Sequence, residues 1–373
     1  MEWKEVTISD IANLKNGKKR PSEPGVIPVF GGNGIMDYVN SFNGEDTIVI
    51  GRVGAYCGCV YLSKGKCWVS DNAIAAKAKE DNDNEYLYYL LSSLNLNYHH
   101  IGGAQPLMTQ DIIGRIEVIV PQTKDDQRRI ASILSSLDRK IELNNKINAD
   151  LEEMAQAIFK NWFVDFEPFK DGKFVDSELG MIPEGWKVGT LGDITNNKST
   201  KVKERNDVKV LSPVTTGELV LSEEYFTKQV FSSSIAKYKI VNKGDFAYNP
   251  ARVNIGSLGR NEFDFDGCVS PVYVVFSVLD GYENYFDLFR KTDFFKDSVA
   301  SLAIGGVRQS LCYDDLSSIE VIIPSENAVE EFNNLYNQMK KTIKANKLES
   351  SRLSLLRDTL LPRLMSGELE IPE

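Results

Sequence analysis

A motif that occurs twice at a fixed separation constrains this chain more than any other feature. Ile-Gly-Gly-x7-Asp-x4-Ile-Glu-Val-Ile-x-Pro begins at Ile101 and again at Ile304, and every matched pair lies 203 positions apart. A repeat of that length is far beyond the roughly 20–50 residues of a solenoid unit. It indicates the tandem duplication of a whole domain, so we expect two similar modules related by a pseudo-symmetry axis.

The duplication extends beyond this motif. Trp3-Lys4 matches Trp186-Lys187 at an offset of 183, and Arg52-Val53 matches Arg252-Val253 at an offset of 200. The offset grows along the chain, which indicates larger loops in the second copy, where domains tolerate insertions. The 373 residues are enough for two domains that each bury a core.

Both copies have the same pattern of expected elements. Short β-rich runs (47–50 and 271–276) precede a helix-like segment (85–94 and 285–299), and a last strand (116–120 and 319–323) ends at a proline. This pattern predicts an α+β fold with two tandem pseudo-symmetric α/β domains separated by an antiparallel coiled coil of two long helices. The expected boundaries are domain 1 at 1–121, long helix 1 at 122–165, a linker at 166–185, domain 2 at 186–324, and long helix 2 with a C-terminal tail at 325–373.

The two long helices are predicted from their apolar spacing. After each proline, apolar residues recur in alternating steps of three and four, as in a coiled-coil seam. In the first helix they fall at Ile130, Ile133, Leu134, Leu137, Ile141, Ile147, Leu151, Met154 and Ile158. Asn144 and Asn346 interrupt their seams at core-type positions, where a polar residue fixes register. The alternative is that each is a solvated Asn on an ordinary surface helix.

Composition limits the class of protein. A hydrophobic fraction of 42% and a charged fraction of 26% are ordinary for a globular protein, and no apolar run approaches the length of a membrane span. Five cysteines without framework spacing predict a reduced, cytoplasmic protein with free thiols and no metal. A zinc site at Cys57, Cys59 and Cys67 is the alternative. The net charge of −10 argues against a protein that coats DNA unaided.

We find no catalytic motif. Asn249-Pro250-Ala251-Arg252 approaches a motif of amino-methyltransferases but lacks its second proline and its aromatic residue, so we interpret it as a turn. Gly31-Gly32-Asn33-Gly34 is not followed by the Lys-Ser/Thr of a phosphate loop. The chain is therefore expected not to be an enzyme.

Loops that combine cations, amides and glycine are the candidate DNA contacts, because Arg reads guanine, Asn and Gln read adenine, and Lys mostly meets phosphate. The equivalent pair Arg52 and Arg252 stands out; a structural salt bridge is the competing explanation for it. The predicted DNA-binding residues are Lys18, Lys19, Arg20, Asn33, Arg52 and Gln105 in the first copy, and Lys198, Lys201, Lys203, Arg205, Arg252, Asn254, Arg308 and Gln309 in the second.

The whole chain resembles the specificity subunit of type I restriction-modification enzymes. The resemblance rests on the two diverged modules with their helices, on Trp162 to Pro168, on Ile182 to Trp186, and on Leu360 to Leu369. It implies that each domain reads one half of a bipartite double-stranded DNA site and that the helices set the gap. It also implies two modification (methyltransferase) subunits and two restriction (translocase and endonuclease) subunits. S-adenosylmethionine, ATP and Mg would bind to those partners and no cofactor to this chain.

The paired helices are expected to act as a rigid spacer of fixed length, like a ruler, between the two domains. A helix of ~39 residues is roughly 58 Å long, and antiparallel pairing would hold the two reading centres one turn of DNA or somewhat more apart. Two other classes remain open at this point: a stand-alone DNA methyltransferase or nuclease with unrecognised motifs, and a scaffold that binds proteins instead of DNA.

Overall fold

The computed structural model describes residues 1–102, 106–232, 234–302, 310–369 and 371, and the chain divides into two compact units. Unit 1 comprises Met1–Ile147 and Ala345–Glu373, and unit 2 comprises Asn148–Lys344. Each unit therefore contains one domain of the duplication together with one half of each long helix. The predicted domain ranges are continuous in sequence, whereas unit 1 is assembled from the two ends of the chain.

Unit 1 contains ten strands, which form one two-stranded and two four-stranded sheets among the described residues. Its elements are β1 (Trp3–Thr7), α1 (Ile8–Ile11), β2 (Ala12–Asn16), β3 (Pro24–Gly31), β4 (Gly34–Val39), β5 (Gly44–Glu45), β6 (Ile48–Gly51), η1 (Gly54–Tyr56), β7 (Val60–Leu62), β8 (Lys66–Val69), β9 (Ala73–Ala78), α2 (Asn84–Ser93), η2 (Leu96–Tyr98), α3 (Gln110–Gly114) and β10 (Glu117–Pro121).

The domain of unit 2 repeats this order of strands. It has an additional helix, α6, between β16 and β17, and the helix α8 in the place of η2. Its elements are β13 (Lys187–Thr190), α5 (Leu191–Ile194), β14 (Thr195–Lys198), β15 (Lys209–Pro213), β16 (Leu219–Leu221), α6 (Ser222–Tyr225), β17 (Lys239–Val241), β18 (Phe246–Tyr248), η4 (Val253–Ile255), β19 (Leu258–Arg260), β20 (Gly267–Val269), β21 (Val274–Val278), α7 (Glu283–Phe289), α8 (Asp293–Leu302), α9 (Tyr313–Ser317) and β22 (Glu320–Ile323).

The sheet topologies of the two domains are the same. The order β2-β9-β6-β7 in unit 1 corresponds to β14-β21-β18-β19 in unit 2, and β4-β3-β8-β5 corresponds to β16-β15-β20-β17. Each domain has one corresponding parallel pair of strands, which is β3 with β8 in unit 1 and β15 with β20 in unit 2. The duplication and the α+β fold class are confirmed.

The last residues of the repeated sequence motif form the strand that closes each domain. β10 pairs antiparallel with β1, and β22 pairs antiparallel with β13, so the first and last strands of each copy are joined. A capping box at Thr7 and Asp10 starts α1, and the equivalent Thr190 and Asp193 start α5. The core of unit 1 is aliphatic, around Ile48 and Ile74, whereas that of unit 2 is aromatic, around Phe246, Phe276 and Phe286.

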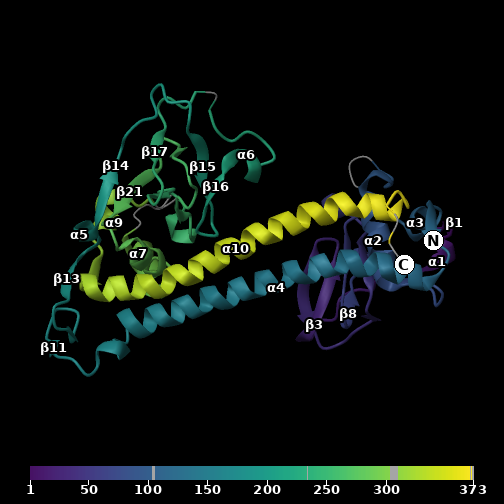
Figure 1. Ribbon diagram of the computed structural model, residues 1–373, viewed down its shortest axis with the longest axis horizontal. Coiled ribbons are helices and arrows are strands. Elements are labelled where there is room, and N and C mark those ends of the chain that lie inside the picture. Colours follow the sequence, from purple (N-terminus) through teal and green to yellow (C-terminus); the bar gives the residue numbers. More distant parts are fainter. Residues whose placement is uncertain (103–105, 233, 303–309, 370, 372–373) are drawn as a thin grey trace. The chain divides into compact units, whose positions relative to one another are not determined.

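The long helices α4 (Lys124–Phe163) and α10 (Glu326–Met365) each have 40 residues. Each passes from one unit to the other, and within each unit their two portions lie side by side (Figure 1). In unit 1, Asp138 bonds Arg357 and Asn144 bonds Ser350, so the pairing is antiparallel. In unit 2, Phe159 and Phe163 contact Phe332 at ring-centroid distances of 6.2 and 5.0 Å.

Part of the predicted seam of α4 is wrong. Met154 is half-exposed, and the buried positions of α4 beyond Ile141 are Asn144, Asn148, Ala155, Phe159 and Phe163. The seam of α4 is therefore apolar towards its ends and polar in its middle. An unbroken run of apolar knobs does not form, because the 3.6-residue helix turns Met154 out of the stripe that Ala155 and Phe159 continue.

Two other predicted elements differ in the structure. The segment 285–299 is not one helix: α7 ends at Phe289 and α8 starts at Asp293, because the Thr292 hydroxyl accepts a hydrogen bond from the Phe295 N–H and so caps a new helix. The strand expected at 271–276 begins only at Val274, because the N–H of Tyr273 bonds the Ser270 carbonyl and closes a turn.

The motif residues of the linker pack together as an aromatic cluster in unit 2. η3 (Glu167–Phe169) and the short strands β11 (Phe174–Val175) and β12 (Ile182–Pro183) lie between α4 and β13. Trp186 is buried against Phe163, Phe166 and Phe169 at centroid distances of 5.9, 5.5 and 5.0 Å. Edge-to-face aromatic contacts of this kind stabilise the start of the second domain.

Candidate nucleic-acid interface

Arg52 lies directly after β6 and its backbone is held on both sides. Its N–H donates to the Asn72 carbonyl at 2.9 Å, and its carbonyl accepts from the Met108 N–H at 2.8 Å. Within the described part of the chain its guanidinium makes one long contact, from Nη1 to the Asp71 carbonyl at 3.5 Å, and its buried Nε has no hydrogen-bond partner there. No carboxylate among the described residues forms an ion pair with Arg52, which disfavours the salt-bridge explanation.

The turn that carries Asn33 lies beside Arg52. A Cβ on Gly32 would be 3.6 Å from the Cα of Gly51 and 3.7 Å from the Cβ of Tyr56, so the turn between β3 and β4 packs closely onto the end of β6. Val53 forms a β-bridge with Leu107, which in turn bridges Ile101, so these two residues lie at the same place. The structure thus brings Asn33 and Arg52 together; Gln105 lies outside the described residues.

The basic segment Lys18–Arg20 borders the same sheet. Lys18 forms a parallel β-bridge with Ser70, and its carbonyl accepts from the Trp68 indole at 3.1 Å. The side chains of Lys18 and Lys19 are exposed and are in no ion pair within the described chain. Arg20 differs, because its Nη1 lies 2.6 Å from the Asp37 carboxylate on β4.

Arg252 occupies the corresponding place in unit 2, after β18. Its N–H donates to the Asn249 carbonyl, its carbonyl accepts from Ser257, and its exposed side chain makes no ion pair with any described residue. Asn254 follows on η4. Gly256 has a φ of +94°, and a Cβ there would lie 2.6 Å from the Thr215 carbonyl, so η4 is pressed against the turn between β15 and β16.

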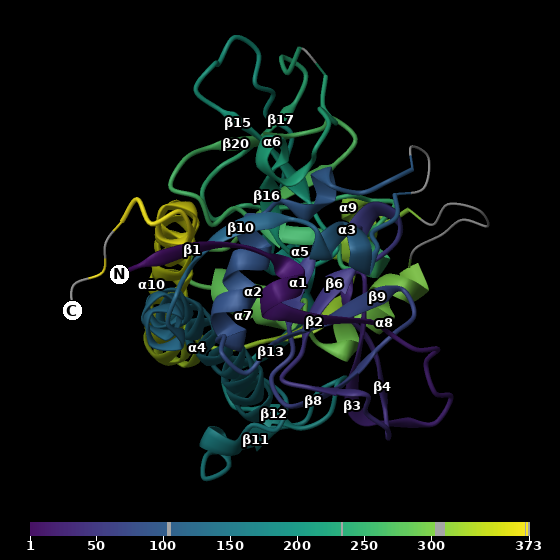
Figure 2. The same cartoon turned by 90° about the vertical axis from the view of Figure 1, so that its right-hand side faces the viewer.

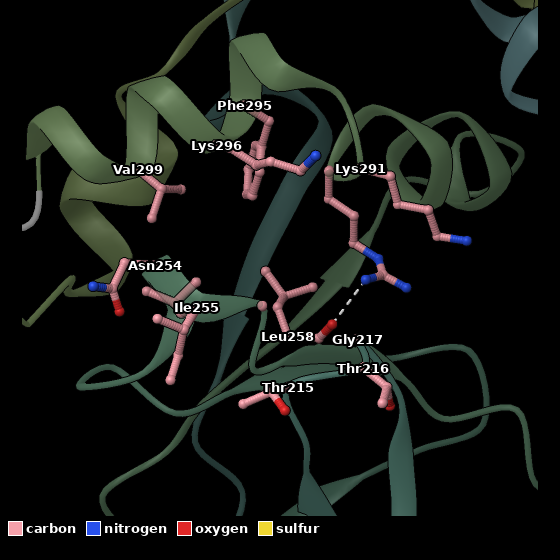
Figure 3. A pocket seen from close by; sticks show the side chains of 13 residues that line it. Thr215, Thr216, Gly217, Asn254, Ile255, Leu258, Lys291, Phe295, Lys296 and Val299 are labelled. Carbon is pink, nitrogen blue, oxygen red and sulfur yellow. Dashed lines mark hydrogen bonds between the residues drawn. The ribbon is translucent and has the colours of Figure 1, made fainter. Parts of the chain in front are cut away.

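A pocket of about 420 Å³ is lined by η4, which includes Asn254 and follows Arg252 in the chain, and this pocket was not predicted from the sequence (Figure 3). The turn at Thr215–Gly217, η4, and the α7–α8 corner enclose it. Arg290 forms its wall: Nη1 donates to the Leu258 carbonyl at 2.8 Å, while Nη2 pairs with the buried Asp287 at 2.6 Å. Lys291 and Lys296 add exposed cations to the rim.

The sequence analysis missed Thr215, Thr216, Lys291 and Lys296. One signal was available, because the offset between the copies rises from 183 to 200 before Arg252 and from 200 to 203 after it, so the second copy has extra residues in both stretches. Thr215 and Thr216 lie in the first stretch, and Lys291 and Lys296 lie in the second. Their approach to η4 depends on tertiary packing that no local pattern encodes.

None of the predicted cations that the structure describes in unit 2 lines this pocket. Lys198 pairs with the buried carboxylate of Asp245 at 2.8 Å, and Arg205 pairs with Asp207 and Asp266 at 2.6 and 3.0 Å. Burial raises the pKa of Asp245, although Lys198 acts against that shift. Lys201 is exposed and forms a β-bridge with Lys239 of β17, and Lys203 is exposed and bonds the Ala236 carbonyl through its N–H. Arg308 and Gln309 fall outside the residues that the structure describes.

Asn144, in the part of α4 that belongs to unit 1, is fully buried. Its Nδ2 donates to Glu349 at 2.8 Å and to Ser350 at 3.3 Å, and its Oδ1 is buried without a partner. Hydrogen bonds from Asn144 and Lys140 lower the pKa of Glu349. Asn346 is only half-buried.

Two further findings concern the described part of the chain. It contains no group of three His, Cys, Asp or Glu side chains arranged to hold a metal ion; Cys57 and Cys67 are buried, and burial raises the pKa of both thiols. None of its helices has the length and apolar character needed to cross a membrane.

A duplicated domain, two paired long helices and cationic loops at equivalent strand ends define a class of protein built from two modules of the same fold. The family model for the type I restriction modification DNA specificity domain matches residues 1–153. The MjaIX specificity subunit of Methanocaldococcus jannaschii is 31% identical over 315 residues, covering 78% of this chain and 70% of that protein. The HindI specificity subunit of Haemophilus influenzae is 26% identical, covering 76% and 77%.

A solved structure has the same fold. The type I restriction-modification S subunit from M. genitalium superposes with a TM-score of 0.65 at 18% identity, covering 100% of this chain and 97% of that one. The chain belongs to the DNA specificity subunits of type I restriction-modification systems.

Proposed function

We propose that the two units each read one half of a bipartite DNA sequence. The observation that carries this proposal is the equivalence of Arg52 and Arg252: the same cation follows the same strand in both domains, and no described carboxylate pairs with either. Around this shared cation the surfaces differ, with the Asn33 turn in unit 1 and the Thr215–Gly217 turn with α8 in unit 2. A common scaffold with different polar tips suits the recognition of two different half-sequences.

The paired portions of α4 and α10 would set the gap between the half-sequences and carry the docking surface for two modification subunits, which two restriction subunits would join. This chain would perform no chemistry itself. S-adenosylmethionine, ATP and Mg would be bound by the partner subunits, and the work on DNA would take place in the cytoplasm. The net charge of −10 supports a need for partners that contribute further phosphate contacts.

The test is to co-express the chain with an adenine methyltransferase subunit and to select bound sequences from a random DNA library. We expect two defined half-sequences separated by unspecified positions of constant number, with affinity that falls steeply with salt. A continuous, unsplit sequence would contradict the proposal. S-adenosylmethionine turnover by the isolated chain would support a stand-alone methyltransferase instead, and a complex without sequence-selective binding would favour a protein-interaction scaffold.

A further inference from the structure

The hairpin of β3 and β4 in unit 1 exposes apolar side chains on both faces of an edge strand. β4 is the outermost strand of the sheet β4-β3-β8-β5 (Figure 2). Its large apolar residues Ile35, Met36 and Tyr38 are 51%, 52% and 49% exposed. Strands that pack on a core bury every second residue, so this strand is built to present its side chains outward.

A bulge produces this arrangement. Phe30 pairs with Ile35 but Val29 pairs with Asp37, so Met36 is an extra residue without an opposite partner. The thioether of Met36 folds back over the turn, where a Cβ on Gly31 would lie 2.8 Å from its Sδ. Bulges of this kind re-aim side chains and often occur beside functional sites.

The equivalent hairpin of unit 2 is different. β16 has only three residues, and Leu219 and Leu221 are 6% and 9% exposed. The exposed apolar strand is therefore not a requirement of the repeated fold. An exposed edge strand with large apolar residues favours unwanted pairing and is normally charged or covered, so its presence in one copy alone indicates a specific occupant.

The charges around the hairpin identify that occupant. Its turn rests on Gly51 beside Arg52, and the strand segment with Lys18 borders it through Ser70, whose Oγ would be 3.7 Å from a Cβ on Gly31. The one carboxylate on β4, Asp37, is neutralised by Arg20. Apolar tips between cations fit a duplex, because the major groove admits a two-stranded ribbon between two phosphate backbones.

We propose that the β3–β4 hairpin of unit 1 enters the major groove and that Ile35 and Met36 contact base edges there, above all the methyl groups of thymine. This inference rests on the proposed DNA-reading function and assigns the residues that carry specificity in one half-site. Unit 2 reads its half-site without a comparable ribbon. The two halves of the sequence are thus recognised by different chemistry, with apolar contact beside the cation Arg52 in one and polar or cationic contact alone in the other.

The test compares full-length variants in complex with the methyltransferase subunit, using selection from a random DNA library. The variants are Ile35→Ala, Met36→Ala and both together, and Ile119→Ala is the matched control because that residue is 55% exposed on β10 of the same unit. We expect the double variant to lose about tenfold discrimination at one or more positions of one half-sequence. The other half-sequence and the gap stay as in the wild type, and Ile119→Ala changes nothing.

Thermal unfolding of each variant checks that the fold is unchanged. An unaltered profile for a folded double variant would overturn the inference, as would a uniform loss of affinity for all sequences. Weaker association with the methyltransferase subunit, with an unchanged profile, would show that the hairpin is a protein interface and would also overturn it. Failure of the wild-type complex to select any split sequence would instead contradict the proposed function, so the two failures are distinguishable.

Discussion

Arg52 and Arg252 show how a single residue can keep its place while its surroundings diverge. Arg52 follows β6 and Arg252 follows β18, which are corresponding inner strands of the equivalent four-stranded sheets. Both residues have their backbone fixed by hydrogen bonds from neighbouring loops. Fixing the backbone while leaving the guanidinium outside any described ion pair keeps the charge available to a ligand. Buried structural arginines in this chain look different, as Arg290 does with all three of its nitrogens bonded.

Replacing these two arginines one at a time should affect one half of the target each. We expect Arg52→Ala to relax one half-sequence and Arg252→Ala the other, each by about 1–3 kcal/mol at the position that the guanidinium reads. Competition binding of the complex to DNA with single base changes would measure this. Arg115→Ala is a suitable control, since Arg115 is exposed and pairs with Asp111. Relaxation of the same half by both variants would contradict the assignment.

The pair Asp287–Arg290 should stabilise unit 2 strongly because both side chains are more than nine-tenths buried. Removing one partner of a buried pair leaves an uncompensated charge, so Asp287→Ala should lower the free energy of unfolding by about 3–5 kcal/mol. Urea unfolding at neutral pH would measure it. The exposed pair Asp293–Lys296 has the same spacing on the next helix, and Asp293→Ala should cost less than about 1 kcal/mol.

The same pair predicts a pH dependence. Burial by itself would raise the pKa of Asp287, but Arg290, Lys291 and Lys340 together outweigh it and hold that pKa well below its ordinary value. A carboxyl with a lowered folded-state pKa contributes stability that is present above the unfolded pKa of about 3.9 and is lost as the pH falls towards the folded value. The difference between wild type and Asp287→Ala should therefore shrink below about pH 4. A difference that is constant down to pH 2 would contradict this reasoning.

Elements whose pattern is local were predictable, and contacts distant in sequence were not. Both long helices and the closing strands follow from periodicity and from prolines at 121 and 324. The ion pairs Lys198–Asp245 and Arg205–Asp266 join residues 47 and 61 positions apart, and so no sequence window showed them, whereas the pair of Arg205 with Asp207 is local. The approach of the Asn33 turn to Arg52 likewise could not be predicted without knowing the order of the strands in the sheets. The DNA contacts assigned to all of these residues stay predictions.

At the level of the helices, the polar middle of α4 should cost stability. Asn144 is buried with one unsatisfied oxygen, which carries a desolvation penalty. We expect Asn144→Leu to raise the free energy of unfolding by about 1 kcal/mol, while weakening the preference for a single register. Asn145→Leu, one residue further on the exposed face, is the control. Chemical denaturation would compare them, and a destabilised Asn144→Leu would show that the Glu349 and Ser350 hydrogen bonds outweigh the desolvation.

At the level of the whole molecule, the two duplicated domains are connected by the two long helices that they share. Each unit takes one domain and half of each helix, so the half of α4 that packs in unit 1 continues directly into unit 2, as does α10 in the other direction. If the helices act as a ruler, the gap in the DNA target depends on their length and the half-sequences depend on the domains alone. Gap and sequence are then separable properties.

Inserting one heptad into both helices tests that separation. Seven residues add about 10.5 Å to each helix and keep the apolar stripe in phase, because seven residues make nearly two turns. Placed after Asn145 in α4 and after Lys347 in α10, the insertions should lengthen the gap by about three base pairs, given ~3.4 Å per step, and leave both half-sequences unchanged. A methylation-protection assay on DNA with a series of gap lengths would measure it. Insertion into one helix alone is the control and should abolish recognition, because the stripes no longer match; an unchanged gap in the double insertion would refute the ruler.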